Sequence, residues 1–140
     1  MDQLVATAKN DHDDFNIFHD DVVEIYLETP ERSCLKITEN SDGKIWDESA
    51  DVTTNSRDTL PARWNPGIKP VVKKEKERCL AEILIPVENF GSLRPNKSYP
   101  WGINVCRNRL AAGTSELSAL SPTGRPTFLD LSKLGHLIVR

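Results

Sequence analysis

The chain has 140 residues, with 18 Lys and Arg against 21 Asp and Glu and a formal net charge of −3. This length predicts a single domain over residues 1–140, and the charge balance argues against nucleic acid as a partner. The apolar runs fall far short of the ~20 residues of a membrane span, and the start MDQLVATAKNDHDD lacks a signal-peptide pattern.

The three cysteines, Cys34, Cys79 and Cys106, lie far apart and include no CxxC pair. This spacing predicts neither a metal knuckle nor a redox dithiol, and an odd count leaves at least one thiol free within the monomer. The three histidines are equally scattered and form no zinc-ligand pattern.

The first half of the chain has the pattern of β-strands. Residues 22–28, VVEIYLE, are rich in β-branched and aromatic residues and predict a strand with Val23, Ile25 and Leu27 on its inner face. Two alternating runs then flank the sequence Asn40-Ser41-Asp42-Gly43. Since glycine tolerates the positive φ of a tight turn, this sequence predicts a β-hairpin.

The middle of the chain predicts a long loop and then a second hairpin. Residues 50–61 are almost entirely polar and are expected to form a surface loop. The segments 67–74 and 78–86 are predicted to pair, the second with one firmly buried face of Cys79, Ala81, Ile83 and Ile85. Residues 86–90 predict a single helical turn, ended by Gly91.

The last third predicts two more strands. In the run WGINVCRNR, Trp101, Ile103 and Val105 share one face, and the polar Asn104 lies on the other. Residues 111–127 are predicted to be a second long loop, and GHLIVR a closing strand. About seven short strands with little helix and long surface loops predict an all-β fold, an antiparallel β-sandwich.

Chemical motifs are sparse. The acidic lead-in around Asp20 and Asp21 is a candidate calcium site, because hard cations prefer several carboxylate oxygens, with a solvated acidic surface as the alternative. Glu24, Asp47 and Glu82 are candidate carboxylates for glycoside hydrolysis, against the alternative that they simply face water.

The three tryptophans are candidate sugar-stacking platforms, because an aromatic ring fits the C–H face of a pyranose. Core packing is the favoured interpretation for Trp101, which opens an alternating strand, and for Trp64 in the sequence WNPG. Trp46 follows Ile45 in a predicted strand and therefore points to the opposite face of the sheet. For this residue, core packing and sugar stacking are about equally supported.

Three sequence stretches in this order, DDVVEIY, AEILIPVENFG and WGINVCRNR, resemble the family 9 carbohydrate-binding modules and their DOMON-like relatives, over residues 1–140. The resemblance implies an immunoglobulin-like β-sandwich that binds a saccharide or polysaccharide end without cleaving it. Such modules are usually attached to secreted bacterial glycoside hydrolases, so an extracellular or periplasmic location is implied, and calcium accompanies some of them.

The resemblance also implies a sugar-binding site. By position, the first stacking aromatic is Phe18, the hydroxyl-binding carboxylate is Glu24, and the polar strand residues are Asn104 and Arg107. The position of the second stacking tryptophan is occupied by Leu120, which has no π-face, so the expected clamp is one-sided.

Family members generally have one or two further strands before the point that aligns with Met1. We therefore expect an exposed sheet edge and a homodimer formed through it. Three other functions are alternatives: an interaction module that has lost its ligand, a glycoside hydrolase, and a haem-binding relative. Haem binding needs axial Met or His ligands, and the candidates are Met1, the only methionine, and His136, the only histidine in a predicted strand.

Overall fold

A computed structural model describes residues 4–31, 33–51, 65–76, 78–86, 88, 94–111 and 113–138. These residues contain eight strands and two short 3-10 helices. The strands are β1 Val22–Glu28, β2 Ser33–Asn40, β3 Ile45–Asp51, β4 Lys69–Lys74, β5 Cys79–Leu84, β6 Trp101–Ala111, β7 Thr114–Ala119 and β8 Gly135–Leu137. The helices are η1 Phe15–His19 and η4 Leu131–Lys133.

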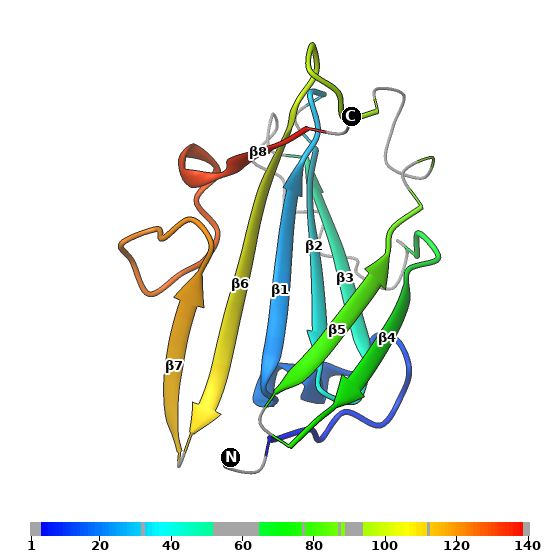
Figure 1. Cartoon of the computed structure of the whole chain (residues 1–140), viewed down its shortest axis with the longest axis vertical. Coiled ribbons are helices and arrows are strands. Elements are labelled where there is room, and N and C mark those ends of the chain that lie inside the picture. The colour runs from blue at the N-terminus through cyan, green and yellow to red at the C-terminus, as the bar shows by residue number, and fades with distance from the viewer. Residues whose placement is uncertain are drawn as a thin grey trace.

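The strands form two antiparallel sheets. The larger has the order β3-β2-β1-β6-β7, with β8 also paired to β6, and the smaller is the hairpin of β4 and β5. Figure 1 shows this hairpin lying across β1, β2 and β3, with η1 on the opposite side of the large sheet. The prediction of an all-β, antiparallel, sandwich-like fold with little helix is therefore confirmed.

The register between strands defines two faces of the large sheet. Ile25 of β1 lies opposite Ile37 of β2 and Val105 of β6, so these side chains share the face that the hairpin covers, which we call the hairpin face. Tyr26 lies opposite Lys36 and Asn104 on the other face, against which η1 packs, and this is the helix face.

The main core lies between the hairpin face and the β4–β5 hairpin. Six buried residues form it: Leu27, Leu35, Ile37, Ile45, Ile68 and Trp101. Ile83 and Ile85 pack against it from β5 and the residue after it. Trp101 is 1% exposed, so the core interpretation of this tryptophan is confirmed.

Both predicted hairpins are present. In the β2–β3 turn, Gly43 has φ 74°, and the Asn40 side-chain oxygen accepts from the backbone N–H groups of Asp42 and Lys44, each at 2.9 Å. Glycine is favoured there because a Cβ strains this left-handed conformation. The β4–β5 pairing joins Lys69 to Leu84 and Lys74 to Cys79.

Two details of the strand predictions were wrong. The segment 111–127 is not one loop, because β7 occupies Thr114–Ala119 within it. The face of β5 predicted to be buried is open at Cys79 and Ala81, since the large sheet does not close over that end of the hairpin. In β1, Val23, Ile25 and Leu27 lie on the hairpin face as predicted, with Leu27 in the main core and Ile25 packed against it, while Val22 and Tyr26 of the helix face are buried as well.

Two predictions concern residues that are mostly outside the described ranges, namely the polar loop 50–61 and the helical turn 86–90. Among the residues that the structure describes, there is no helix with the length and apolar character needed to cross a bilayer.

Candidate functional site

Three aromatic rings meet at one end of the helix face. Phe18 of η1 lies 5.0 Å from Trp46 of β3 between ring centroids, and Phe15 lies 5.2 Å from Phe18 and 6.0 Å from Trp46, all edge to face. We call these three rings the aromatic cluster. Its Phe15 is 69% exposed, so the cluster presents ring surface to solvent.

The turn η1 sets the position of these rings. Its N-cap Asp14 accepts from the Asn16 backbone N–H, and the Asp20 N–H closes the turn on the carbonyl of Ile17. Ile17 is buried with Ala8 and Val22 in a second small core, and Phe18 and Trp46 pack against that core. Burial of Ile17 leaves Phe15 on the outer side of the turn.

A strip of charged side chains continues from the aromatic cluster across the helix face. The Lys36 ammonium lies 3.6 Å from Glu24 and 3.5 Å from Glu48, and it also lies 5.2 Å from the centre of the Phe18 ring. The Tyr26 hydroxyl donates to Glu24 at 2.5 Å. Burial and the neighbouring Glu24 carboxylate hold the pKa of Tyr26 far above its usual range, so this hydroxyl stays a neutral donor.

This arrangement has the components of a sugar-recognition surface. Aromatic rings bind the apolar C–H face of a sugar, while carboxylate and ammonium groups beside them bond its hydroxyls. Phe18 and Glu24, the two residues identified by family resemblance and aligned most securely, lie on this same face, and Lys36 contacts both.

Asn104 lies on the helix face but is fully buried. Its side-chain amide donates to the Ser121 carbonyl at 2.9 Å, and its oxygen accepts from the Ser121 N–H at 3.0 Å. These bonds fix the segment that follows β7. Asn104 therefore has a structural role here, and its amide group is already engaged.

Arg107 and Leu120 lie away from the aromatic cluster. Arg107 is paired with Val23 across the β1–β6 ladder, which places it on the hairpin face. The Leu120 N–H donates to the carbonyl of Val105, so Leu120 continues the β6–β7 register opposite a hairpin-face residue, with its side chain 72% exposed. The structure therefore does not bring Leu120 against Phe18 as a clamp.

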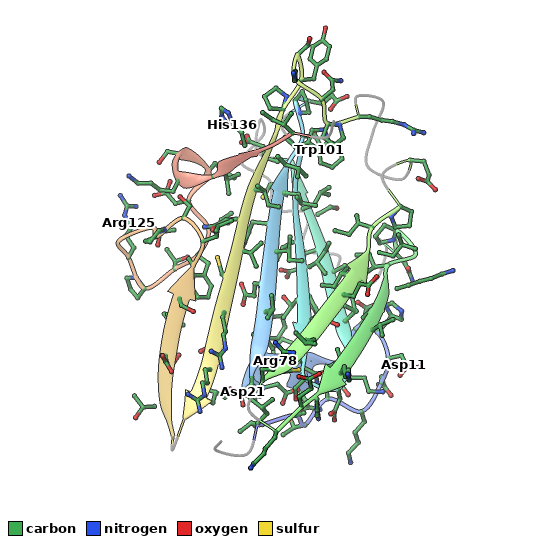
Figure 2. The ribbon with its side chains drawn as sticks, in the orientation of Figure 1. Asp11, Asp21, Arg78, Trp101, Arg125 and His136 are labelled. Carbon is green, nitrogen blue, oxygen red and sulfur yellow. The ribbon has the colours of Figure 1, made fainter. Side chains whose placement is uncertain are left out.

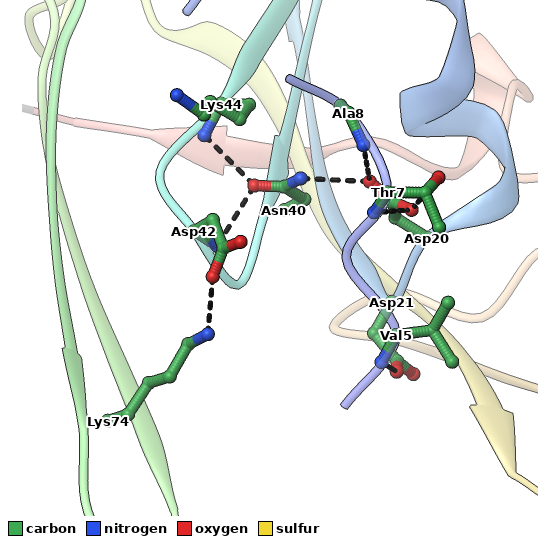
Figure 3. Close-up of polar contacts among 9 residues, drawn as sticks. All are labelled: Val5, Thr7, Ala8, Asp20, Asp21, Asn40, Asp42, Lys44 and Lys74. Carbon is green, nitrogen blue, oxygen red and sulfur yellow. Dashed lines mark hydrogen bonds and ion pairs between the residues drawn. The ribbon is translucent and has the colours of Figure 1, made fainter. Parts of the chain in front are cut away.

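The candidate calcium ligands Asp20 and Asp21 are hydrogen-bonded within the protein (Figure 3). The Asp20 carboxylate accepts from the Thr7 N–H and hydroxyl, the Ala8 N–H and the Asn40 amide, at 2.6, 2.7, 3.1 and 2.8 Å. Asp21 accepts from the N–H groups of Val5 and Leu110. Carboxylate oxygens surrounded by donors in this way do not fit a cation.

The same network anchors the segment 5–8 to the sheet, so Asp20 and Asp21 fasten the N-terminal segment rather than form a solvated acidic surface. Among the described residues, no group of three or more His, Cys, Asp or Glu is arranged to hold a metal ion.

The candidate catalytic carboxylates do not face one another. Glu24 lies on the helix face, Asp47 is buried on the hairpin face opposite Ile37, and Glu82 is exposed on β5 opposite Val71. His136 is exposed on β8 opposite Gly102. Trp64, a stacking candidate, and Met1, a haem candidate, lie outside the described residues.

Sequence reasoning missed Phe15, Lys36 and Glu48. The hairpin register carried the signal for the last two, because a turn at residues 41–44 pairs Lys36 with Glu48 and so places both on one face. Comparison with protein families, with curated proteins and with solved structures finds no significant match to this chain.

Proposed function

We propose that this protein binds a saccharide, without cleaving it, on the helix face of its large sheet. The observation that carries the proposal is the contact of the aromatic cluster, in which Phe15 is exposed and Phe18 and Trp46 are half-buried, with the Glu24–Lys36–Glu48 charged strip. A sugar ring rests on Phe15 and Phe18, and its hydroxyls bond Glu24 and Lys36. The family resemblance supports the same function, as an accessory module of polysaccharide breakdown in an extracellular or periplasmic setting.

The electrostatics of the strip favour a neutral sugar over a charged one. Glu24 and Glu48 balance Lys36 and leave one excess negative charge, which repels an anionic ligand. Hydroxyl groups suit the strip better, because each can donate to a carboxylate and accept from the ammonium. The helix face is therefore expected to prefer a neutral saccharide end.

Substitution of the stacking ring tests this proposal. Phe18→Ala is expected to weaken saccharide binding by about tenfold or more, because the stacking surface and the ring beneath Lys36 are lost together. Glu24→Gln is expected to weaken it by a similar factor through loss of a charged acceptor. Calorimetric titration of both variants with mono- and disaccharides measures the change.

Tyr99→Ala is the matched control, since Tyr99 is an exposed ring in the segment before β6, outside the aromatic cluster. It should bind like the original protein. Saccharide binding that survives both Phe18→Ala and Glu24→Gln unchanged would contradict the assigned site. An absence of saccharide binding by the original protein would favour the alternative of an interaction module without a sugar ligand.

We also propose that the protein forms a homodimer through β7. This strand ends the order of the large sheet, and its residues from Thr114 to Ser118 are exposed, including the apolar Leu117. An uncovered strand presents unpaired backbone groups to a second chain. The other end of the sheet, at β3, is partly covered by the bridge between His12 and Ile45.

A charge on β7 tests this dimer. Leu117→Lys is expected to shift the protein from dimer to monomer in sedimentation equilibrium, because a lysine on an edge strand opposes edge-to-edge pairing. Leu80→Lys, at a comparably exposed position on β5, should leave the dimer intact. A monomer at all concentrations for the original protein would refute the proposal.

A further inference from the structure

A recess lies on the hairpin face, between the large sheet and the end of the β4–β5 hairpin that carries Lys74 and Cys79. It has a volume of about 460 Å³ and is lined by charged groups from three directions, including Asp21, Glu39, Arg78, Arg107 and Arg109. Figure 2 shows Asp21 and Arg78 at this end of the molecule. A volume of this order suits a molecule the size of a monosaccharide.

Glu39 is the unusual member of this lining. It is 2% exposed, and neither carboxylate oxygen has a hydrogen-bond partner among the described residues. A buried carboxyl group without partners is costly, and polar groups of this kind are ordinarily satisfied. Because Glu39 lines the recess, a molecule bound there is a candidate partner for its carboxyl group.

The other acid of the recess differs from Glu39, because the Asp21 oxygens already accept from the backbone N–H groups of Val5 and Leu110. The three arginines also differ from one another. Arg78 donates to Glu75 at 2.6 Å, and Arg109 lies 3.6 Å from Glu116. Arg107 forms no ion pair with any described residue, so it is the cation of this recess that is available to a ligand.

We propose that this recess binds a small molecule through a carboxylate group, which pairs with the Arg107 guanidinium and forms a hydrogen bond with the carboxyl group of Glu39. One available guanidinium matches a single negative charge, and its planar pair of N–H donors fits the two oxygens of a carboxylate. The site lies on the opposite face from the aromatic cluster and is independent of the saccharide site proposed there.

The protonation of Glu39 gives this site a direction of pH dependence. Burial raises the pKa of Glu39 to about 7, so the donor form predominates at pH 6 and the anion at pH 8. Ionised Glu39 repels a carboxylate and loses its donor. The charged or titratable groups around the recess are Asp21 beside β1, Lys74 of β4 with Asp42 of the β2–β3 turn, Arg78 and Cys79 at β5, and Arg107 and Arg109 of β6.

The test compares D-glucuronate with D-glucose, which differ by the carboxylate, in an NMR titration of the uniformly labelled protein. D-Glucuronate is expected to shift the Arg107 side-chain signal and to bind about tenfold more tightly at pH 6 than at pH 8. D-Glucose should leave the Arg107 signal unchanged. Inorganic phosphate should bind more weakly than D-glucuronate.

Two variants complete the test. Arg107→Gln is expected to abolish the response at this recess, and any response of the aromatic cluster to D-glucose should remain, which separates this site from the saccharide site. Glu39→Gln keeps a donor without the charge, so its binding should become independent of pH. Arg125→Gln, in an exposed loop, is the control.

Three results would overturn the proposal: no shift of the Arg107 signal with D-glucuronate at either pH, tighter binding at pH 8 than at pH 6, or unchanged binding by Arg107→Gln.

Discussion

The free energy of unfolding is expected to fall by several kcal/mol as the pH rises from 5 to 8. Two buried carboxyl groups on the hairpin face cause this loss. Burial raises the pKa of Asp47 to about 7, with a contribution from the nearby Asp13 charge, and burial raises the pKa of Glu39 to about 7 as well. Both side chains are almost completely buried, and Asp47 Oδ2 has no hydrogen-bond partner among the described residues.

The direction of this pH dependence follows from comparing the protonation of the two carboxyl groups in the folded and the unfolded chain. Below about pH 3 both groups are mostly protonated in the folded and the unfolded chain, and the free energy of unfolding is then unaffected by them. Between their ordinary pKa values and about 7 the unfolded chain releases protons that the folded chain keeps, so stability declines with rising pH. Each group accounts for a loss on the order of 3 kcal/mol.

Asp47→Asn tests this prediction, because the amide is nearly isosteric and does not ionise. Urea unfolding of the variant between pH 5 and pH 8 should show about half of the original pH dependence, with a gain in stability at pH 8. Stability that rises over this pH range in the original protein would show that the two carboxyl groups are not buried as described.

Asp20→Ala is expected to destabilise the folded protein strongly. Removing this carboxylate leaves the donors of Thr7, Ala8 and Asn40 without their acceptor in a buried site. Loss of a buried, multiply bonded charged acceptor costs about 3–5 kcal/mol. Chemical unfolding should show this loss, together with earlier hydrogen exchange in the segment 5–8 that Asp20 fastens.

Asp130→Ala is the control for this substitution. Asp130 caps η4 by accepting from Ser132, at a surface position, and its removal should cost much less. Millimolar calcium should leave the melting temperature of the original protein unchanged. A clear rise with calcium that Asp20→Ala removes would restore the cation interpretation of this acidic pair.

Local sequence signals predicted the hairpins well. The Asp42-Gly43 turn fixes the pairing of β2 with β3, and alternation identified β1 and β6 with their correct face parity at Trp101 and Asn104. The strand β7 was missed because TSELSA is mostly exposed and polar, and its pairing with β6 is an edge contact without an apolar pattern. The burial of β5 was overestimated, because the alternation of apolar residues along this strand does not show how far the large sheet extends beneath it.

The candidate sites depended on long-range register. Phe18 and Glu24 lie close in sequence. Their position on the same face of the sheet follows because β1 begins soon after η1, without any long-range pairing. The face of Arg107 is set by its pairing with Val23, which no local pattern specifies. The burial of Glu39 depends on where the β4–β5 hairpin packs against the large sheet. The local sequence around Glu39 therefore cannot show whether its carboxyl group is exposed to solvent or buried without a partner.

The most direct test of the central claim is an amide-resolved NMR titration of the original protein with glucose, xylose, cellobiose and xylobiose. Saturable shifts at Phe15, Phe18, Glu24, Lys36 and Trp46 are the predicted result, because these residues form the aromatic cluster and the charged strip beside it. Shifts confined to other parts of the chain, or none with any saccharide, would contradict saccharide binding on the helix face.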